Sequence, residues 1–229
     1  MITGGSRGIG LAMARAFADA EYAVIITARD SGRLSEAVAD LKERGAWIDG
    51  IPCDVCDPAA VARAFEIIQQ QYKTIDVLVN NAGVAHELLP ADKLPLETWK
   101  QVINTNLTGT FLTTQAALPL MSTGGTIVNN LSVAATQPFA GMSAYNAAKF
   151  GAMGFTKALR EEVRKQGIRV LALIPGATNT DIWQQFWPEA PREQMMTPET
   201  VAKAVLHAVS APPEASVEEI VIGPTAGVL

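Results

Sequence analysis

The sequence predicts an α/β fold, namely a single doubly wound parallel sheet of about seven strands with helices on both faces. Near-continuous apolar segments alternate with helical segments along the chain, which is typical of strands that are buried on both faces. The length of 229 residues suits one large domain. No linker, repeat or low-complexity stretch interrupts the alternation, so we expect residues 1–229 to form one domain.

The first strand is unusually short. Only Met1 and Ile2 precede the glycine-rich stretch TGGSRGIG, whereas strands usually have about 5–6 residues. Either the natural chain begins earlier or this strand is a stub. The amphipathic pattern that follows predicts a helix over residues 11–20, and the apolar run YAVIITA predicts a strand over residues 22–28.

The alternation continues to the end of the chain. Further strands are expected at residues 47–53, 75–79, 126–131, 168–174 and 219–222. Further helices are expected at residues 31–44, 58–72, 99–121, 145–164 and 198–210. Ligands in such sheets bind beyond the carboxyl ends of the strands, so we expect functional residues in the loops at that edge.

The composition excludes several classes of protein. Hydrophobic residues make up 48%, which is too many for a disordered chain. The formal net charge of −5 offers no basic field that would attract nucleic acid. Neither an apolar run long enough for a membrane span nor a signal-peptide pattern is found. We therefore expect a cytoplasmic protein that binds neither nucleic acid nor membranes.

The cysteines do not indicate a metal site. Cys53 and Cys56 have the C-x-x-C spacing, but there is no second pair and the only histidines are His86 and His207. Zinc normally takes four ligands, or three and a water. We therefore interpret the two cysteines as incidental thiols.

A tyrosine and a lysine stand four residues apart, at Tyr145 and Lys149, in a stretch that predicts a helix. Their side chains would lie on one helix face. A nearby cation favours the phenolate and lowers the pKa of a phenol, which is ordinarily about 10. Such a pair by itself is more often part of an ordinary solvated face, so the rest of the chain decides its meaning.

The glycine-rich stretch suits a phosphate group. Glycines permit a tight turn and let the backbone approach a pyrophosphate at a helix N-terminus. Gly4, Gly8 and Gly10 give the spacing Gly-x-x-x-Gly-x-Gly, a variant of the dinucleotide-binding fingerprint that is a weak signal by itself.

Polar residues and glycines follow the expected strands at their carboxyl ends. Ordinary loops would explain any one of these residues, but not readily the whole set. They are Arg29 and Asp30 after the second strand, Asp54 after the third, Asn80, Asn81, Ala82 and Gly83 after the fourth, Ser132 after the fifth, and Pro175, Gly176 and Thr180 after the sixth, with Asn106 in the long helix.

With these motifs in place, the chain resembles the short-chain dehydrogenase/reductase family, from Ile2 to Ile222. Ser132 precedes Tyr145 by 145 − 132 = 13 positions, as in many members. The resemblance is to NADP-dependent carbonyl and 3-oxoacyl reductases of the Tyr-x-x-x-Lys type. It implies a Rossmann-type sheet and an oxidoreductase that transfers a hydride between NADP(H) and a carbonyl or secondary alcohol.

The resemblance also implies roles for single residues. Tyr145 would be the general acid or base, and Lys149 would lower its pKa and bind the nicotinamide ribose. Ser132 would donate to the substrate oxygen, and Asn106 would hold a water that relays protons from Lys149 to bulk solvent. The cofactor-binding residues implied are Gly4, Ser6, Arg7, Gly8, Ile9, Gly10, Arg29, Asp54, Val55, Asn81, Ala82, Gly83, Tyr145, Lys149, Pro175, Gly176, Thr178 and Thr180.

Arginines favour NADP(H) over NAD(H). An acid at the end of the second strand binds the ribose 2′-hydroxyl of NAD, whereas arginine accommodates the 2′-phosphate of NADP. The family's acidic position falls on Ala28, Arg29 follows it, and Arg7 lies in the glycine-rich stretch. Asp30 would hold the ribose instead if the strand ended later, so NAD(H) stays possible.

The substrate pocket and the assembly are less clearly indicated. Apolar residues at 107–121 and 150–159 exceed one core-facing stripe, and with the family resemblance they predict a homodimer or homotetramer. Aromatic residues after the sixth strand could form a lid, pack in the core or contact another subunit. The pocket candidates are Trp183, Phe186, Trp187, Met195 and Met196, with His86, Gln137 and Phe139.

The leading interpretation is an NADP-dependent carbonyl reductase or alcohol dehydrogenase that acts on a small organic substrate. The alternatives are an NAD-dependent alcohol dehydrogenase of the same family, an NADP-binding sensor without turnover, and a structural subunit. Neither a sensor nor a structural subunit needs Tyr145 and Ser132.

Overall fold

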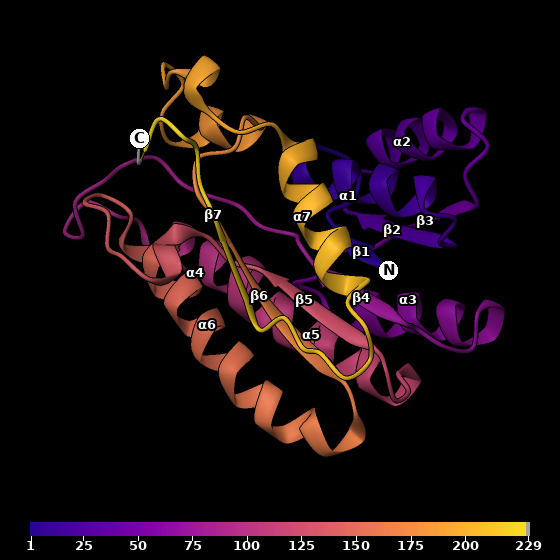
Figure 1. The fold of residues 1–229 in the computed structure, drawn as a ribbon. Coiled ribbons are helices and arrows are strands. Elements are labelled where there is room, and N and C mark those ends of the chain that lie inside the picture. Colours follow the sequence, from indigo (N-terminus) through magenta and orange to yellow (C-terminus); the bar gives the residue numbers. More distant parts are fainter. Residues whose placement is uncertain (228–229) are drawn as a thin grey trace.

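The computed structural model describes residues 1–227 and contains a seven-stranded sheet in which all neighbouring strands are parallel (Figure 1). The spatial order is β3-β2-β1-β4-β5-β6-β7. This arrangement confirms the predicted fold class. The strands are β1 (Ile2–Thr3), β2 (Val24–Ala28), β3 (Ile48–Pro52), β4 (Val77–Asn80), β5 (Thr126–Asn130), β6 (Arg169–Pro175) and β7 (Glu219–Ile222).

Helices cover both faces because the strands are apolar on both sides. Successive strand residues point to opposite faces, so Ile26 packs in the core under one set of helices and Ile25 in the core under the other. The first set is α1 (Gly8–Asp19), α2 (Ser31–Glu43) and α7 (Pro198–Val209). The second face carries α3 (Pro58–Gln71), α4 (Leu96–Ile103), α5 (Gly109–Ala117) and α6 (Ser143–Val163).

The strand order reverses at β1. The chain runs outward from β1 through β2 to β3, and then returns to place β4 on the other side of β1. Although β1 has only two residues, Ile2 pairs with both Ile26 and Val79, so the stub is an interior strand between β2 and β4. A ligand crevice is expected beyond the carboxyl ends of the strands at such a switch point.

The long helix predicted over residues 99–121 is wrong in detail. The helical segment begins at Leu96 and contains a π-helical turn, Asn104–Thr108, between α4 and α5. Within this turn, the Asn106 side chain donates to the Val102 carbonyl at 2.9 Å. Wide turns of this kind are frequent at functional sites, and this one places Asn106 beside the loop after β4.

The helix predicted over residues 11–20 begins earlier, at Gly8. The last two glycines of the glycine-rich stretch therefore form the first turn of α1 and not part of the loop before it. The backbone N–H groups of this first turn have no partner within the helix, which suits them to bind an anion.

A buried polar network joins the two central strands to the helices of the second face. The Asn80 side chain donates to Asn129 at 2.8 Å and to Thr114 at 2.9 Å, and Asn129 donates to Thr156 at 2.9 Å. Thr113 donates to Asn80 at 2.6 Å. Because buried amides are costly when unpaired, this network fixes how α5 and α6 lie on the sheet.

Within residues 1–227, no helix combines the length and the apolar character that crossing a bilayer requires.

Candidate active site

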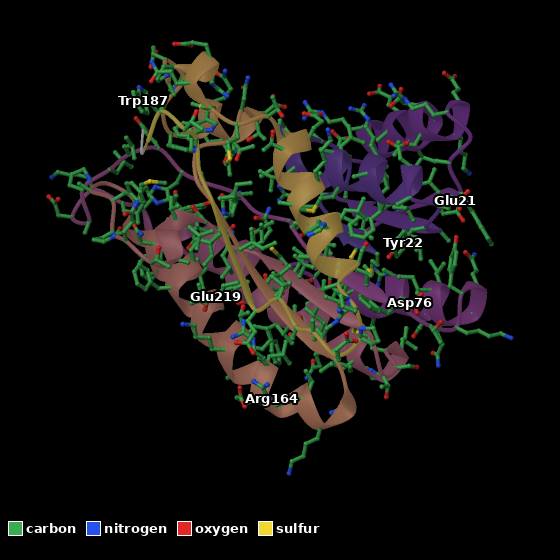
Figure 2. All side chains as sticks on the ribbon, in the orientation of Figure 1. Glu21, Tyr22, Asp76, Arg164, Trp187 and Glu219 are labelled. Carbon is green, nitrogen blue, oxygen red and sulfur yellow. The ribbon has the colours of Figure 1, made fainter. Side chains whose placement is uncertain are left out.

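A cavity of about 930 Å³ lies beyond the carboxyl ends of the strands. Its volume is in the range of small-molecule and cofactor sites. The aromatic segment after β6 stands above this edge, and Figure 2 shows Trp187 there, at the opposite end of the molecule from Arg164 after α6. The cavity therefore occupies the switch point that the strand order predicts.

Most of the predicted site residues line this cavity. Two do not, namely Gly10 and Asp54. The residues brought together are Gly4, Ser6, Arg7, Gly8, Ile9, Arg29, Val55, Asn81, Ala82, Gly83, Asn106, Ser132, Tyr145, Lys149, Pro175, Gly176, Thr178 and Thr180.

Both exceptions have structural explanations. A Cβ added at Gly10 would lie 2.3 Å from the Gly4 carbonyl oxygen and 2.4 Å from the Asn81 amide, so this glycine lets α1 pack against the turn. The Asp54 side chain accepts a hydrogen bond from the Cys56 backbone N–H at 2.9 Å and shapes the loop after β3. Cys53 and Val55 line the cavity there.

A chain of amides connects three strand ends. The Asn81 Nδ2 donates to the carbonyl oxygens of Thr3 and Gly4 at 3.0 and 3.1 Å, which fixes the orientation of the amide. Its Oδ1 must then accept, and it does so from the Asn130 Nδ2 at 2.8 Å. The Asn130 Oδ1 is consequently left as a buried acceptor without a partner among the described residues, on the wall of the cavity.

Lys149 is buried and held by the end of β5. Its side chain is 6% exposed, and its Nζ donates to the Asn130 carbonyl oxygen at 2.9 Å. Burial lowers the pKa of Lys149 from 10.5 to about 8. The Nζ lies 5.6 Å from the centre of the Tyr145 ring, so the helix places the pair on one face as the sequence predicts.

The predicted direction of the Tyr145 pKa is wrong for this structure. Burial raises the pKa of Tyr145 to about 12, and a hydrogen bond with Ser132 opposes that shift only in part. Desolvation of the phenolate therefore outweighs the hydrogen bond with Ser132, and Lys149 does not bring the pKa of Tyr145 toward neutral. Tyr145 is accordingly protonated at neutral pH and able to donate a proton.

The loop that carries Ser132 is tied to the helix that carries Tyr145. Asn146 in α6 donates to the carbonyl oxygens of Ala134 and Gln137 and accepts from the Phe139 N–H, at 2.9 to 3.0 Å. The Ser132 hydroxyl also accepts a hydrogen bond from the Ala134 N–H at 3.1 Å. These contacts fix the distance between the two candidate catalytic hydroxyls.

The Asn106 side chain is occupied by the backbone. It donates to the carbonyl oxygens of Val84 and Val102 and accepts from the Val84 N–H. A Cβ added at Gly83 would lie only 2.7 Å from the Asn106 Oδ1, so the close approach of this side chain requires a glycine there. These bonds support a positioning role for the side chain, and the water relay predicted for Asn106 stays a prediction.

One end of the cavity is rich in arginine. Arg7, Arg29 and Arg33 all line it. Strand β2 ends at Ala28, as the sequence predicts, and Asp30 caps α2 by accepting a hydrogen bond from the Arg33 N–H. Arg33, the third residue of α2, also lines the cavity, which the sequence did not predict, although a basic residue four positions after Arg29 was a visible signal.

The aromatic segment forms part of the opposite wall. Trp183, Phe186 and Trp187 line the cavity, with ring centres 4.7 Å apart for the first pair and 6.1 Å for Trp183 and Trp187. Of the other pocket candidates only Phe139 lines it. The candidates that do not are His86, Gln137, Met195 and Met196.

A hydrogen bond crosses from this segment to the loop after β4. The Gln185 side chain accepts from the Ala85 N–H at 2.9 Å, across 100 positions of the chain. The sequence carries no local signal for this contact. Gln185 and Asn130 are thus site residues that became visible only in three dimensions.

The depressed pKa of Lys149 has a testable effect on stability. The unfolded chain keeps the Lys149 proton up to about pH 10.5, whereas the folded protein keeps it only up to about pH 8. Burying the charged ammonium therefore lowers the free energy of unfolding most below pH 8, and this loss becomes smaller as the pH rises from 8 to 10.5. Without added nucleotide, the free energy of unfolding of the wild type should rise relative to Lys149→Met by about 2 kcal/mol from pH 7.5 to 9.5. Urea titration at fixed protein concentration measures it.

Lys157→Met is the matched control, because Lys157 lies on the same helix with its side chain more than half exposed. Parallel stability profiles for the wild type and Lys149→Met over this pH range would contradict the assigned pKa.

The comparisons with known proteins agree with this geometry. The family model described as short chain dehydrogenase matches residues 1–191. Sepiapterin reductase of Chlorobaculum tepidum is 37% identical over 236 residues, which cover 99% of this chain and 96% of the relative.

Two solved structures have the same fold over nearly the whole chain. An alcohol dehydrogenase from the archaeon Thermococcus sibiricus, complexed with 5-hydroxy-NADP, has a TM-score of 0.90 at 28% identity and covers 99% of this chain and 96% of its own. A short chain dehydrogenase from Burkholderia cenocepacia in complex with NADP has a TM-score of 0.87 at 32% identity, covering 96% and 94%. This chain therefore belongs to the short chain dehydrogenase family of NAD(P)-dependent oxidoreductases.

Proposed function

We propose that this protein transfers a hydride between NADP(H) and a carbonyl or secondary alcohol substrate, with Tyr145 as the general acid or base. The observation that carries the proposal is that one cavity brings a protonated phenol, at Tyr145, and the Ser132 hydroxyl to the same strand edge as the glycine-rich turn. A protein that only bound the nucleotide would need neither hydroxyl.

The residues fit a dinucleotide on structural grounds. Gly4 has a φ of +64°, and a Cβ there would lie 2.9 Å from the Ala82 Cα, so the turn next to the cavity requires glycine. The first turn of α1 follows directly and offers N–H groups to a phosphate. The buried Asn130 Oδ1 offers an acceptor to a hydroxyl group on the cavity side.

Each catalytic side chain has a defined part. The nicotinamide, when bound, supplies or accepts the hydride. The Tyr145 hydroxyl donates its proton to the carbonyl oxygen in reduction, and in oxidation the Tyr145 phenolate accepts the proton of the alcohol. Ser132 donates a hydrogen bond to the same oxygen as negative charge develops on it. Lys149, anchored by the Asn130 carbonyl, would hold the nicotinamide ribose, and Asn106 keeps the loop after β4 in place.

NADP(H) is the cofactor that we propose. Arg7 and Arg29, with Arg33, bring three guanidinium groups to one end of the cavity, and guanidinium groups bind phosphates with charge-assisted hydrogen bonds. Asp30, the residue that would favour NAD(H), is already used as the cap of α2 and in an ion pair with Arg33. The two similar structures in complex with NADP and 5-hydroxy-NADP support the same choice.

Other parts of the proposal concern the chain as a whole. We propose that residues 1–229 form a single dinucleotide-binding and catalytic domain, of which 228–229 lie outside the described residues. We also propose a cytoplasmic location, which the two free cysteines support because disulfides are rare in that compartment. The alternatives are an NAD-dependent alcohol dehydrogenase and an NADP-binding sensor without turnover.

Replacing Tyr145 with phenylalanine tests the acid/base assignment. The variant keeps the ring but loses the proton donor, so NADPH binding should persist while turnover falls by at least ~10². The measurement is NADPH consumption at 340 nm with a panel of ketones and aldehydes, alongside NADPH binding by fluorescence. Near-wild-type turnover of the variant would contradict the assignment of Tyr145 as the general acid or base.

Removing both arginines tests the cofactor preference. Arg7→Ala combined with Arg29→Ala should raise the Michaelis constant for NADPH by about 10- to 100-fold and leave that for NADH nearly unchanged, because only the 2′-phosphate loses its partners. The lower figure allows for solvent exposure at this rim. Arg44→Ala, outside the cavity, is the control. A wild-type enzyme that uses NADH better than NADPH would contradict the preference.

We propose that the chain assembles as a homodimer or homotetramer through α5 and α6. Phe111 and Phe150 on these helices are 42% and 46% exposed, more than a monomer needs to leave in water. Light scattering should give two or four times the mass of one chain, and Phe111→Asp with Phe150→Asp should reduce that mass. Trp47→Asp, at an exposed site elsewhere, should leave it unchanged. A monomer of the wild type at micromolar concentration would refute the assembly.

A further inference from the structure

The charged side chains that line the cavity are unevenly distributed. Of the described lining residues, the arginines lie on the glycine-rich turn and beyond β2, where the nucleotide phosphates are proposed to bind. Asp181 forms a 3.7 Å ion pair with Arg7. At the catalytic end, Lys149 is the one charged residue among the described lining, and the Asn130 carbonyl holds it at the floor of the cavity.

The walls around Tyr145 are apolar on both sides. Leu88 and Phe139 line the cavity from the loops after β4 and β5. The aromatic segment after β6 lines it with Trp183, Phe186 and Trp187. The Trp183 ring is oriented by its indole N–H, which donates to the Thr178 carbonyl at 2.8 Å, so it presents a fixed surface.

Two of the polar side chains near these walls already have partners within the protein. Gln185 is bound to the Ala85 N–H, and Arg192 donates to the carbonyl oxygen of Thr180 without lining the cavity. A carboxylate, sulfonate or phosphate on the substrate would therefore find Lys149 as the one cation at this end, and the Asn130 carbonyl already binds that ammonium group. Desolvating an unpaired anion is costly, whereas an apolar ring gains from contact with the aromatic side chains.

We infer that the substrate is an uncharged ketone or aldehyde that carries a planar aromatic or conjugated group, which packs on Trp183, Phe186 and Trp187 while its carbonyl oxygen meets Tyr145 and Ser132. The inference rests on the proposed function and adds the substrate class. In the reduction, the carbonyl carbon gains the hydride of NADPH and its oxygen gains the Tyr145 proton as the C=O π bond breaks. The products are an uncharged alcohol and NADP⁺.

Four ketones with the same reacting carbonyl test the inference. 4-Phenylbutan-2-one and 4-cyclohexylbutan-2-one differ in whether the remote ring is aromatic and flat or saturated and puckered, and the phenyl ketone should have the higher kcat/KM, by about fivefold or more. 4-(4-Carboxyphenyl)butan-2-one should be worse than its methyl ester by at least ~10² in kcat/KM. All are assayed with saturating NADPH by absorbance at 340 nm and product analysis.

Two exposed positions on opposite walls allow the charge preference to be changed. Trp187 is 38% exposed and Leu88 is 44% exposed, so neither is required by the core. Trp187→Arg or Leu88→Arg should improve kcat/KM for the carboxylate at least tenfold relative to its ester. Trp187→Leu should reduce the preference for phenyl over cyclohexyl. Trp47 is 71% exposed and lies outside the cavity. The control variants Trp47→Arg and Trp47→Leu should therefore change neither the carboxylate-to-ester ratio nor the phenyl-to-cyclohexyl ratio of kcat/KM.

The outcomes separate this inference from the function beneath it. If the wild type reduces the carboxylate as well as the ester, or the cyclohexyl ketone as well as the phenyl ketone, the inferred substrate class is wrong while the proposed hydride transfer stands. If it binds NADPH but reduces none of these ketones and no other carbonyl compound, the proposed function fails and the inference with it.

Discussion

The site depends on a short chain of amide hydrogen bonds at the centre of the sheet. Asn81 donates to two carbonyl oxygens at the end of β1 and accepts from Asn130 at the end of β5. Because each amide orientation is set by the previous one, three strand ends are held in a single register. The same Asn130 offers its backbone carbonyl to Lys149 and leaves its side-chain oxygen on the cavity wall. The positions of the glycine-rich turn and of Lys149 are therefore coupled.

This arrangement buries the ammonium group of Lys149, which is unfavourable for its charged form. Holding an ammonium group at the floor of the cavity lowers its pKa to about 8, and the same burial raises the pKa of Tyr145 to about 12. Such perturbed groups in a cleft are typical of functional sites, although structural ion pairs also perturb pKa values. Among residues 1–227 no carboxylate pairs with Lys149, so a purely structural explanation would leave its burial without a compensating gain. A protonated tyrosine beside a buried cation suits proton donation to a carbonyl oxygen.

The sequence predicted those features that depend on local pattern. Alternating apolar and helical segments predicted the sheet, the four-residue spacing predicted that Tyr145 and Lys149 share a face, and the boundary of β2 at Ala28 was placed correctly. Features made by residues far apart were missed, such as the Asn81–Asn130 bond across 49 positions and the Gln185–Ala85 bond across 100. No periodicity marks such pairs.

The motifs did not distinguish glycines and acids that line the cavity from those that shape the backbone next to it. The spacing of the glycine-rich stretch predicted that Gly10 meets the cofactor; in the structure Gly10 does not line the cavity, and its missing Cβ lets α1 approach the Gly4 carbonyl. Asp54 likewise shapes a turn and does not line the cavity. Burial raises the pKa of Tyr145, whereas the sequence led us to expect that Lys149 would lower it. The sequence reveals that a charged residue is near the phenol, but it does not reveal how far the phenol is removed from water.

The most direct test of the central claim is to follow the hydride itself. NADPH deuterated at the transferring position of the nicotinamide is incubated with the protein and a ketone that it consumes, and the alcohol is examined by mass spectrometry and NMR. The account predicts one deuterium on the carbinol carbon of the product for each NADPH oxidised. Tight binding of NADPH with no ketone consumed, or an alcohol that lacks the deuterium, would contradict it.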